Sequence, residues 1–246
     1  MDKLSVNPYV CLNRFTVIDY IKFILGTPLV VIRTNTTNDN NKNIKAPIII
    51  LLPHTSIFDL LAVAYFREVT CVARDQRVLE TDFMRMQTAI ARLGNPILVK
   101  REEAASRQKV IEKIKERAKT EQVLILPEGT CSNTKVVLQF KSGAFKPGLA
   151  VQPYIIEYNC DDCCLKGIDH TSWVREGTPL LLSMWITACK LWTSMSITKL
   201  PVYVPNESEK EDVVLYASNV QKFISTLTGL RFAHYSYDDN KFLGFW

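Results

Sequence analysis

The stretch APIIILLPHTSIFD, residues 46–59, predicts a buried strand followed by a polar loop and the start of a helix. Its first half is a short run of branched apolar residues, as in strands that are covered on both faces of a sheet. The pattern S-x-x-D, at Ser56 and Asp59, is a capping box for a helix N-terminus. We therefore expect His54 on the loop before the helix and Asp59 in its first turn.

His54 and Asp59 have two possible roles. Residues five apart on one continuous helix point about 140° away from each other, so they would not meet there. With His54 on the loop, the carboxylate can fold back toward the imidazole and hold one of its tautomers. The capping role needs no chemistry and is compatible with the chemical one, so the spacing alone leaves both open.

Further short, branched runs alternate with helical stretches along the chain. EEAASRQKVIEKIKERAK, residues 102–119, has a helical pattern, and the last helix is expected over 209–228, with a capping box at Ser208 and Glu211 and its end at Gly229. This alternation predicts an α/β fold with a mixed, largely parallel central sheet flanked by helices. The other expected strands are VTCVA (69–73), NPILVKR (95–101), QVLILPEG (122–129) and VQPYIIEY (151–158).

Polar and charged residues follow several of these strands. Glu128, Gly129 and Thr130 follow one strand, and Arg101 follows another. Ligands of open α/β sheets bind at such strand ends, and arginine suits phosphate because its guanidinium can donate two parallel hydrogen bonds. Lys141, in FKSGAFKPG, offers a further cation. These five residues are candidates for binding a phosphate-bearing substrate.

The order of these motifs resembles the glycerolipid acyltransferase superfamily, which includes the 1-acylglycerol-3-phosphate acyltransferases. Its four ordered blocks are H-x-x-x-x-D, an arginine after a second strand, E-G-T after a third, and a V-x-P strand, here Val151 to Pro153. The first block is usually written N-H-x-x-x-x-D, and Pro53 stands here in place of the asparagine. PEGTCSN, FKSGAFKPGLAVQPYIIEY and LPVYVPNESEKEDVVLYASNV narrow the resemblance to the lysophosphatidylcholine acyltransferase branch, over about Pro47 to Leu230.

The resemblance implies a glycerol-3-phosphate acyltransferase-like fold and transfer of an acyl group from acyl-CoA to the free hydroxyl of a lysophospholipid, with lysophosphatidylcholine as the leading acceptor. An alcohol is a poor nucleophile at neutral pH, so a base must take its proton. The implied base is His54, with Asp59 holding its tautomer. The implied contacts of the acceptor's glycerophosphate part are Arg101, Glu128, Gly129 and Thr130, and Lys141 is expected near a phosphate of either substrate.

Acyl-CoA is expected as a co-substrate, and we expect no cofactor and no metal. The cluster CDDCC, residues 160–164, offers only one C-x-x-C, which is a poor zinc signature. The formal charge of +5 is modest for a nucleic-acid binder and compatible with an anionic lipid surface. The expected partners are therefore acyl-CoA, a lysophospholipid and a membrane surface, without nucleic acid, and the resemblance implies the endoplasmic reticulum membrane.

The chain divides into three expected parts. Residues 1–44 are expected to be a membrane-associating, helical apolar segment followed by an Asn-rich linker, since Arg14, Asp19 and Lys22 interrupt the apolar run and leave too few residues for a span of about 20. An ordinary helix packed on the domain is the alternative for this segment. The acyltransferase domain is expected over 45–205, with a C-terminal helix and tail over 206–246 packed on it.

Three alternatives stay open. The acceptor can be lysophosphatidic acid or glycerol 3-phosphate instead. A nucleophilic-cysteine enzyme would need a thiol beside one of His54, His170 and His234, and Cys131, just after E-G-T, is the cysteine nearest the expected site. Some superfamily members lose block residues and act as membrane scaffolds, but the histidine, the aspartate and E-G-T are all present here.

Overall fold

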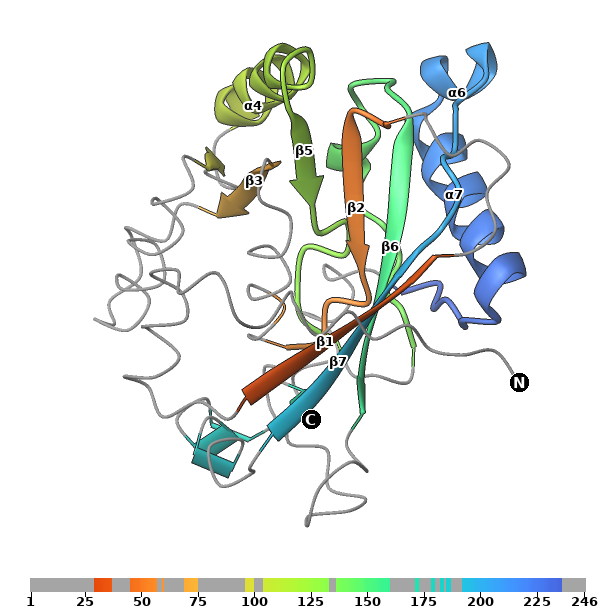
Figure 1. The fold of residues 1–246 in the computed structure, drawn as a ribbon. Helices are drawn as coiled ribbons and strands as arrows, with labels where there is room; N and C mark the ends of the chain where they lie inside the picture. The colour runs from red at the N-terminus through yellow and green to blue at the C-terminus, as the bar shows by residue number, and fades with distance from the viewer. Residues whose placement is uncertain are drawn as a thin grey trace.

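The computed structural model describes residues 29–36, 45–56, 59, 69–74, 96–99, 104–132, 136–159, 171–172, 178–179, 182–183, 185–186 and 192–235. Its strands and helices form layers around one sheet (Figure 1). The strands are β1 (Leu29–Thr36), β2 (Ile48–Leu52), β3 (Val69–Arg74), β4 (Ile97–Val99), β5 (Gln122–Ile125), β6 (Val151–Asn159) and β7 (Trp192–Lys199). The helices are α4 (Ala104–Arg117), the short 3-10 turn η2 (Ser142–Ala144), α6 (Glu207–Glu211) and α7 (Val213–Thr228).

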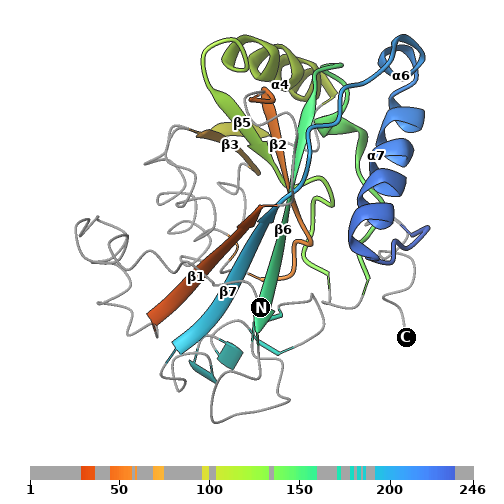
Figure 2. The same ribbon diagram turned by 45° about the vertical axis from the view of Figure 1, so that its right-hand side comes forward.

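The seven strands of the described residues form a sheet in the order β1-β7-β6-β2-β5-β3-β4. β6 and β7 are antiparallel, and every other neighbouring pair is parallel. The predicted mixed, largely parallel sheet is therefore confirmed. The strands fan out strongly, as expected of a twisted sheet (Figure 2). Because β2, β5 and β6 are adjacent and parallel, the segments that follow their C-terminal ends meet at one edge of the sheet.

The central strand β2 is buried on both faces, which explains why it is apolar at every position. Ile48, Ile50 and Leu52 face one core, and Ile49 and Leu51 face the other. In Figure 1, α4 lies on the β5 side of β2, and α6 and α7 lie on the β6 side. Helices α4 and α7 both pack on the first core, the first through Val110 and Ile114 and the second through Tyr216, Val220 and Ile224.

The C-terminal helical region differs from the predicted single helix. It is divided into α6 and α7, because Asp212 has an extended backbone and caps the N-terminus of α7 with its carboxylate. The prediction of a capping box at Ser208 is wrong, since the capping box is formed by Asn206 and Glu209. Gly229 ends α7 in the left-handed conformation, with φ at 71°, so the predicted end of the helix is confirmed.

Strand β1 lies within the stretch 1–44 that the sequence separates from the domain. It pairs in parallel with β7 at the edge of the sheet, so residues 29–36 add a strand to the domain. Residues 1–28 and 37–44 lie outside the described residues, and most of the predicted membrane-associating segment lies there. In the part of the chain that the structure describes, no helix has the length and the apolar character needed to span a membrane.

Candidate active site

His54 lies on the loop that follows the C-terminal end of β2, and its side chain is 17% exposed. Its backbone is held on two sides by the segment that follows β5. The N–H donates to Glu128 Oε1 at 2.6 Å, and the carbonyl accepts from the N–H of Ser132 at 2.7 Å. His54 and Glu128 are 74 residues apart in sequence, so the position of the histidine depends on the pairing of β2 with β5.

Asp59 folds back onto this loop and is only 1% exposed. Its Oδ2 lies 2.7 Å from His54 Nδ1 and also accepts the backbone N–H groups of Thr55 and Ser56, at 3.0 and 3.1 Å. Its Oδ1 accepts the phenolic O–H of Tyr158 at 2.6 Å. The bond from Ser56 is the half of the predicted capping box that the acidic residue supplies. The structure thus brings His54 and Asp59 together, and the cap and the pair coexist.

The contact with Asp59 determines the tautomer of His54. A carboxylate only accepts hydrogen bonds, so Nδ1 carries a proton, and in the neutral imidazole Nε2 keeps the lone pair. Burial is the strongest single influence and lowers the pKa of His54, but the hydrogen bond with Asp59 and the contacts with Cys131 together outweigh it and raise that pKa above 6.5. The imidazole is therefore a stronger base than a free histidine side chain.

Glu128 is fully buried in the turn after β5. Oε1 accepts from the backbone of His54, and Oε2 accepts from the Ser132 hydroxyl at 3.1 Å and the N–H of Leu138 at 2.9 Å. Burial raises the pKa of Glu128 to about 7, and these hydrogen bonds oppose the rise. Gly129 then turns the chain with φ at 69°, a conformation that glycine adopts without strain. Glu128 thus fastens three segments of the site to one another.

Cys131 lies beside the imidazole ring of His54, at nearly equal distances from its two nitrogens. Its Sγ lies 3.4 Å from Nε2 and 3.8 Å from Nδ1. Thiol, imidazole and carboxylate therefore follow one another in the order that nucleophilic-cysteine enzymes use. An acceptor hydroxyl must approach Nε2 along its lone pair, close to this sulfur, if His54 is its base. The geometry is compatible with both chemistries.

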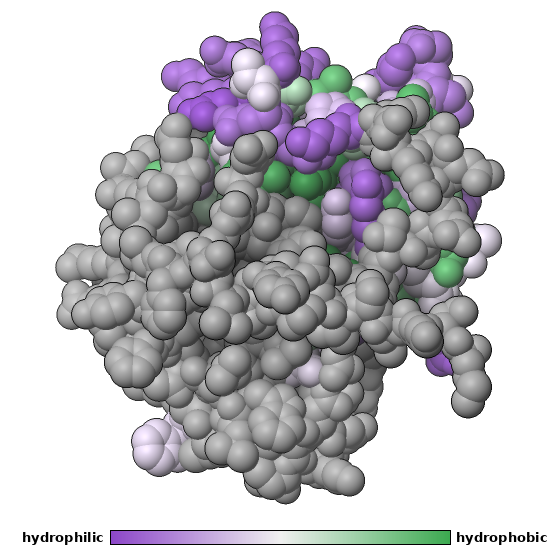
Figure 3. All heavy atoms as spheres, in the orientation of Figure 1, coloured by the Kyte–Doolittle hydropathy of each residue, from purple (hydrophilic) through white to green (hydrophobic). Residues whose placement is uncertain are grey.

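A cavity of about 920 Å³ lies beside the same turn, against the sheet face that α4 and α7 cover. Gly129 and Lys141 line this cavity, whereas His54 and Asp59 do not. In Figure 3, the described residues at the top of the view are hydrophilic over α4 and α6, and hydrophobic residues are visible between them. The lining is apolar at Val72, Val99, Val110, Ile114 and Ile125, and it includes the cations of Lys141, Lys146 and Lys222. An apolar wall with a few cations suits an amphiphile with an anionic group.

The range matched by a protein family includes His54, Asp59, Glu128 and Tyr158. A protein-family model described as Acyltransferase matches residues 33–158, slightly more than half of the chain. The chain belongs to this acyltransferase family. The matched range contains the His54 loop, the Glu128 turn and all of β6 except its last residue, Asn159.

Several curated proteins are similar to this acyltransferase chain. Lysophosphatidylcholine acyltransferase 1 of Danio rerio is 35% identical over 199 residues, which cover 79% of this chain and 36% of that protein. Lysophospholipid acyltransferase LPCAT4 of Homo sapiens is 34% identical over 212 residues, covering 85% of this chain and 38% of that protein. The chain thus spans little more than a third of the length of these relatives. A solved structure, the 1-acyl-sn-glycerophosphate (LPA) acyltransferase PlsC of Thermotoga maritima, is 19% identical with a TM-score of 0.48, covering 79% of this chain and 72% of that one.

The other predicted binding residues lie in different surroundings. Arg101 lies outside the described residues. Thr130 is half-buried on the turn after Gly129. Lys141 lines the cavity, and its backbone N–H donates to the carbonyl of Pro127 at 2.8 Å, which holds it beside the E-G-T turn. In the described residues, no group of three His, Cys, Asp or Glu side chains is arranged to hold a metal ion.

Two further residues contact the pair and its supports without having been predicted from the sequence. Ser132 lies in the motif PEGTCSN, four residues after Glu128. A hydroxyl so close in sequence to this glutamate could have indicated the hydrogen bond between them. Tyr158 ends VQPYIIEY, and strand alternation places it on the same face as Ile156. That alternation does not tell which face carries Asp59, because the contact joins residues 99 apart in sequence.

Proposed function

We propose that this chain is the acyltransferase domain of a membrane-associated enzyme, which moves a fatty acyl group from acyl-CoA to the free hydroxyl of a lysophospholipid. Lysophosphatidylcholine is the leading acceptor. The observation that carries the proposal is the contact of His54 Nδ1 with Asp59 Oδ2 at 2.7 Å, next to the E-G-T turn. The names of the similar proteins, lysophosphatidylcholine and lysophospholipid acyltransferases, support the acceptor class.

In the proposed reaction, His54 Nε2 takes the proton of the acceptor hydroxyl as the oxygen attacks the thioester carbonyl of acyl-CoA. The new ester C–O bond forms and the C–S bond breaks. CoA leaves as a thiolate and recovers the proton from His54, so atoms and charges balance. Asp59 stabilises the imidazolium that exists between these steps. Positioned acid-base catalysis of this kind contributes about 10² to 10⁴-fold to the rate.

We assign the cavity to the hydrocarbon chain of a substrate. Its walls are apolar at Ile114 of α4 and Ala217 of α7, and each buried CH₂ group of a chain contributes about 0.8 kcal/mol. Lys141 is the proposed partner of a substrate phosphate. Arg101, Gly129 and Thr130 stay assigned to the glycerophosphate part of the acceptor. Glu128 has both oxygens bonded to protein donors, so its proposed role is to hold the loop of His54.

A covalent route is the second candidate, because Cys131 Sγ lies 3.4 Å from His54 Nε2. In that route the thiol gives its proton to His54 and takes the acyl group as a thioester, and CoA leaves with the proton. The lipid hydroxyl then attacks the acyl-cysteine, with His54 again as the base, the C–S bond to Cys131 breaks, and the thiolate recovers the proton from His54. Direct transfer needs a single displacement and is the route that we propose. A non-catalytic scaffold would not need the bonded His54 and Asp59 pair.

The experiment that tests the function is an acceptor panel. Purified protein in detergent or in liposomes receives acyl-CoA and one acceptor at a time, and free CoA thiol is measured. The panel contains lysophosphatidylcholine, other lysophospholipids, lysophosphatidic acid and glycerol 3-phosphate. We expect the fastest release with lysophosphatidylcholine. If another acceptor gives a faster rate, that acceptor takes the place of lysophosphatidylcholine in the proposal. If no acceptor leads to release of CoA, a non-catalytic scaffold is favoured.

We further propose that the domain works at a membrane surface, since both substrates are amphiphiles, and the resemblance to lysophosphatidylcholine acyltransferases favours the endoplasmic reticulum. The formal charge of +5 favours contact with anionic lipids. Residues 1–44 are the proposed membrane-associating part, although β1 extends the sheet back to Leu29. The proposed catalytic part is 45–205, and the proposed C-terminal part, 206–246, contains α6 and α7.

A further inference from the structure

Tyr158 contacts the catalytic pair from a different strand. Its phenolic O–H donates to Asp59 Oδ1 at 2.6 Å, while Asp59 Oδ2 faces His54 Nδ1 at 2.7 Å. We propose that Tyr158 is a positioning residue, which holds the Asp59 carboxylate so that Oδ2 alone faces the imidazole. This inference rests on the proposed function of His54 as the base, and nothing in the acyltransferase blocks assigns a role to this tyrosine.

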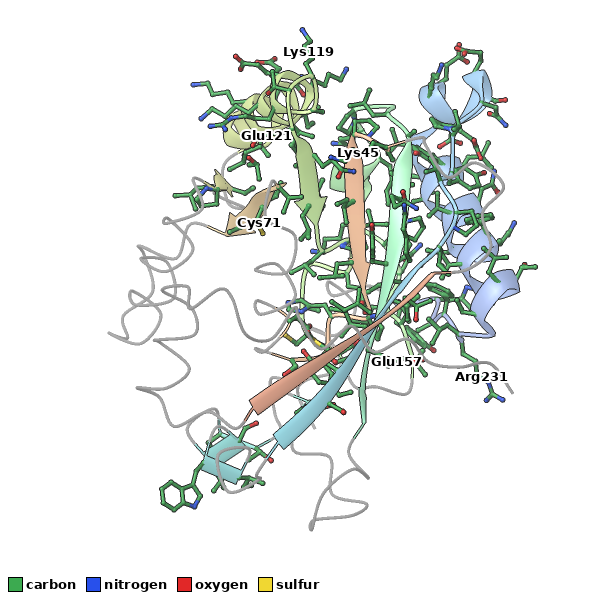
Figure 4. The ribbon with its side chains drawn as sticks, in the orientation of Figure 1. Lys45, Cys71, Lys119, Glu121, Glu157 and Arg231 are labelled. Atoms are coloured by element: carbon green, nitrogen blue, oxygen red, sulfur yellow. The ribbon has the colours of Figure 1, made fainter. Side chains whose placement is uncertain are left out.

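The reach of Tyr158 follows from the unequal lengths of two paired strands. β2 ends at Leu52, whose partner on β6 is Ile155, but β6 continues to Asn159. The last residues of β6 therefore extend beside the loop that carries His54. Glu157, labelled in Figure 4, lies near the C-terminal end of β2. Side chains alternate along a strand, so Glu157 is exposed while Tyr158 turns to the other face.

The hydrogen bond from Tyr158 goes to Oδ1 of Asp59, whereas the imidazole faces Oδ2. Oδ2 accepts from Thr55 N–H and Ser56 N–H besides its contact with His54, whereas the Tyr158 hydroxyl is the donor to Oδ1. A donor on Oδ1 stops the carboxylate from rotating and draws negative charge away from Oδ2. Tyr158 therefore has two effects on the base: it fixes the geometry of the pair and it limits the attraction for the imidazolium.

The titratable groups around the pair agree with a neutral tyrosine. Burial and the neighbouring Asp59 carboxylate raise the pKa of Tyr158 well above 10, so the phenol keeps its proton over the working pH range. In the described residues, Asp59 and Cys131 face the ring of His54, and Glu128 accepts from its backbone. Ser56 and Cys131 are the other groups that influence the pKa of Tyr158, and its hydrogen bond to Asp59 is the contact by which it reaches the pair.

The first test replaces the hydroxyl and keeps the ring. Tyr158→Phe should lower kcat about tenfold at neutral pH and leave the KM for acyl-CoA unchanged, because the unrestrained carboxylate holds the imidazolium more strongly. The acidic limb of the pH–rate profile should move to higher pH. Tyr203→Phe is the matched control: its hydroxyl donates to Glu209 Oε1, also at 2.6 Å and away from the site. A Tyr158→Phe protein that only loses thermal stability, as Tyr203→Phe should, would overturn the proposal.

A second measurement separates this proposal from the proposed function. Nuclear magnetic resonance titration follows the three histidines of the chain, with His54 assigned by its loss in His54→Ala. The pKa of His54 should rise in Tyr158→Phe even if no lysolipid is a substrate. If Tyr158→Phe does not fold, 3-fluorotyrosine at this position keeps the shape and makes a stronger donor. It should then lower the pKa of His54, and an unchanged titration would contradict the role of Tyr158.

Discussion

Glu128 Oε1 accepts the backbone N–H of His54 at 2.6 Å, so the glutamate of E-G-T is bonded directly to the proposed base residue. The E-G-T turn and the H-x-x-x-x-D loop thus form one unit at the edge of the sheet. The second oxygen of the carboxylate is bonded to Ser132 and Leu138. A change at Glu128 must therefore alter the position of His54, in addition to any effect on substrate binding.

Glu128→Gln is expected to reduce both activity and stability. The amide keeps one acceptor oxygen and places an NH₂ group against either the His54 N–H or the Leu138 N–H, both of which are donors. A buried donor left without an acceptor costs about 1–3 kcal/mol, which chemical unfolding can measure. Glu207→Gln is the control, since Glu207 is exposed and only pairs with Lys210. Unchanged kcat in Glu128→Gln would show that the bond does not position the base.

Asp59→Asn tests whether the Asp59 carboxylate fixes the tautomer of His54. The amide oxygen can still accept from Thr55 and Ser56, but the imidazole loses its carboxylate partner. The plateau of kcat should fall about 10² to 10⁴-fold. Because burial lowers the pKa of His54 and the bond to Asp59 raises it, the acidic limb should move to lower pH.

The matched control for Asp59→Asn is Asp212→Asn, since Asp212 also accepts two backbone N–H groups at a helix start. It should leave the pH–rate profile unchanged. In the wild-type enzyme the acidic limb of the pH–rate profile should lie above pH 6.5. The pKa of His54 is raised, so its neutral, basic form appears only at higher pH. An acidic limb that keeps its position in Asp59→Asn would contradict the assignment of that limb to His54.

Cys131→Ala separates direct from covalent transfer. Direct transfer predicts that the variant keeps kcat within about threefold at its optimum, because the thiol takes no part in the proton transfer to Nε2. The contacts with Cys131 help to raise the pKa of His54, so the acidic limb should move to lower pH. Mass spectrometry of the quenched enzyme should find no acyl group on Cys131.

The control for this substitution is Cys71→Ala. Cys71 is the other free thiol of the described residues and lies on β3, far from Glu157 in Figure 4. Burial raises the pKa of Cys71 to about 11, so this thiol stays protonated. Loss of turnover in Cys131→Ala alone, together with an acyl-cysteine in the wild type, would replace direct transfer by the covalent route.

Ala217→Phe tests the assignment of the cavity. Ala217 lines it from α7 and is buried, so a phenyl ring there shortens the space for a hydrocarbon chain. Activity with a series of acyl-CoA or lysolipid chain lengths should shift toward shorter chains, by about tenfold between long and short. Leu215→Phe, at an exposed position of the same helix, should not change the preference. An unaltered preference in Ala217→Phe would remove the cavity from the substrate site.

The local part of the site could be predicted from the sequence. His54 and Asp59 are five residues apart, and a strand, a loop and a capped helix start suffice to bring them together. The apolar run of β2 and the alternating elements likewise predict the parallel part of the sheet. The residues that hold the pair in place could not be predicted in this way. Glu128 follows β5 and Tyr158 lies on β6, so their contacts depend on how these strands are arranged in the sheet.

The C-terminal helix shows a different limit. Ser208 with Glu211 and Asn206 with Glu209 both match a capping box in the sequence. The structure uses the second, in which Glu209 is also bonded to Tyr203 and Asn219. These tertiary partners decide between two equal local signals, and a sequence pattern does not contain them.

His54→Ala tests the central claim most directly. The measurement is the rate of CoA release from acyl-CoA with the best acceptor of the panel, at the pH optimum of the wild type. Thermal unfolding should show that the variant still folds, since Asp59 keeps its bonds from Thr55, Ser56 and Tyr158. We predict a loss of at least about 10²-fold in kcat. A folded His54→Ala protein with nearly wild-type turnover would contradict the role of His54 as the base.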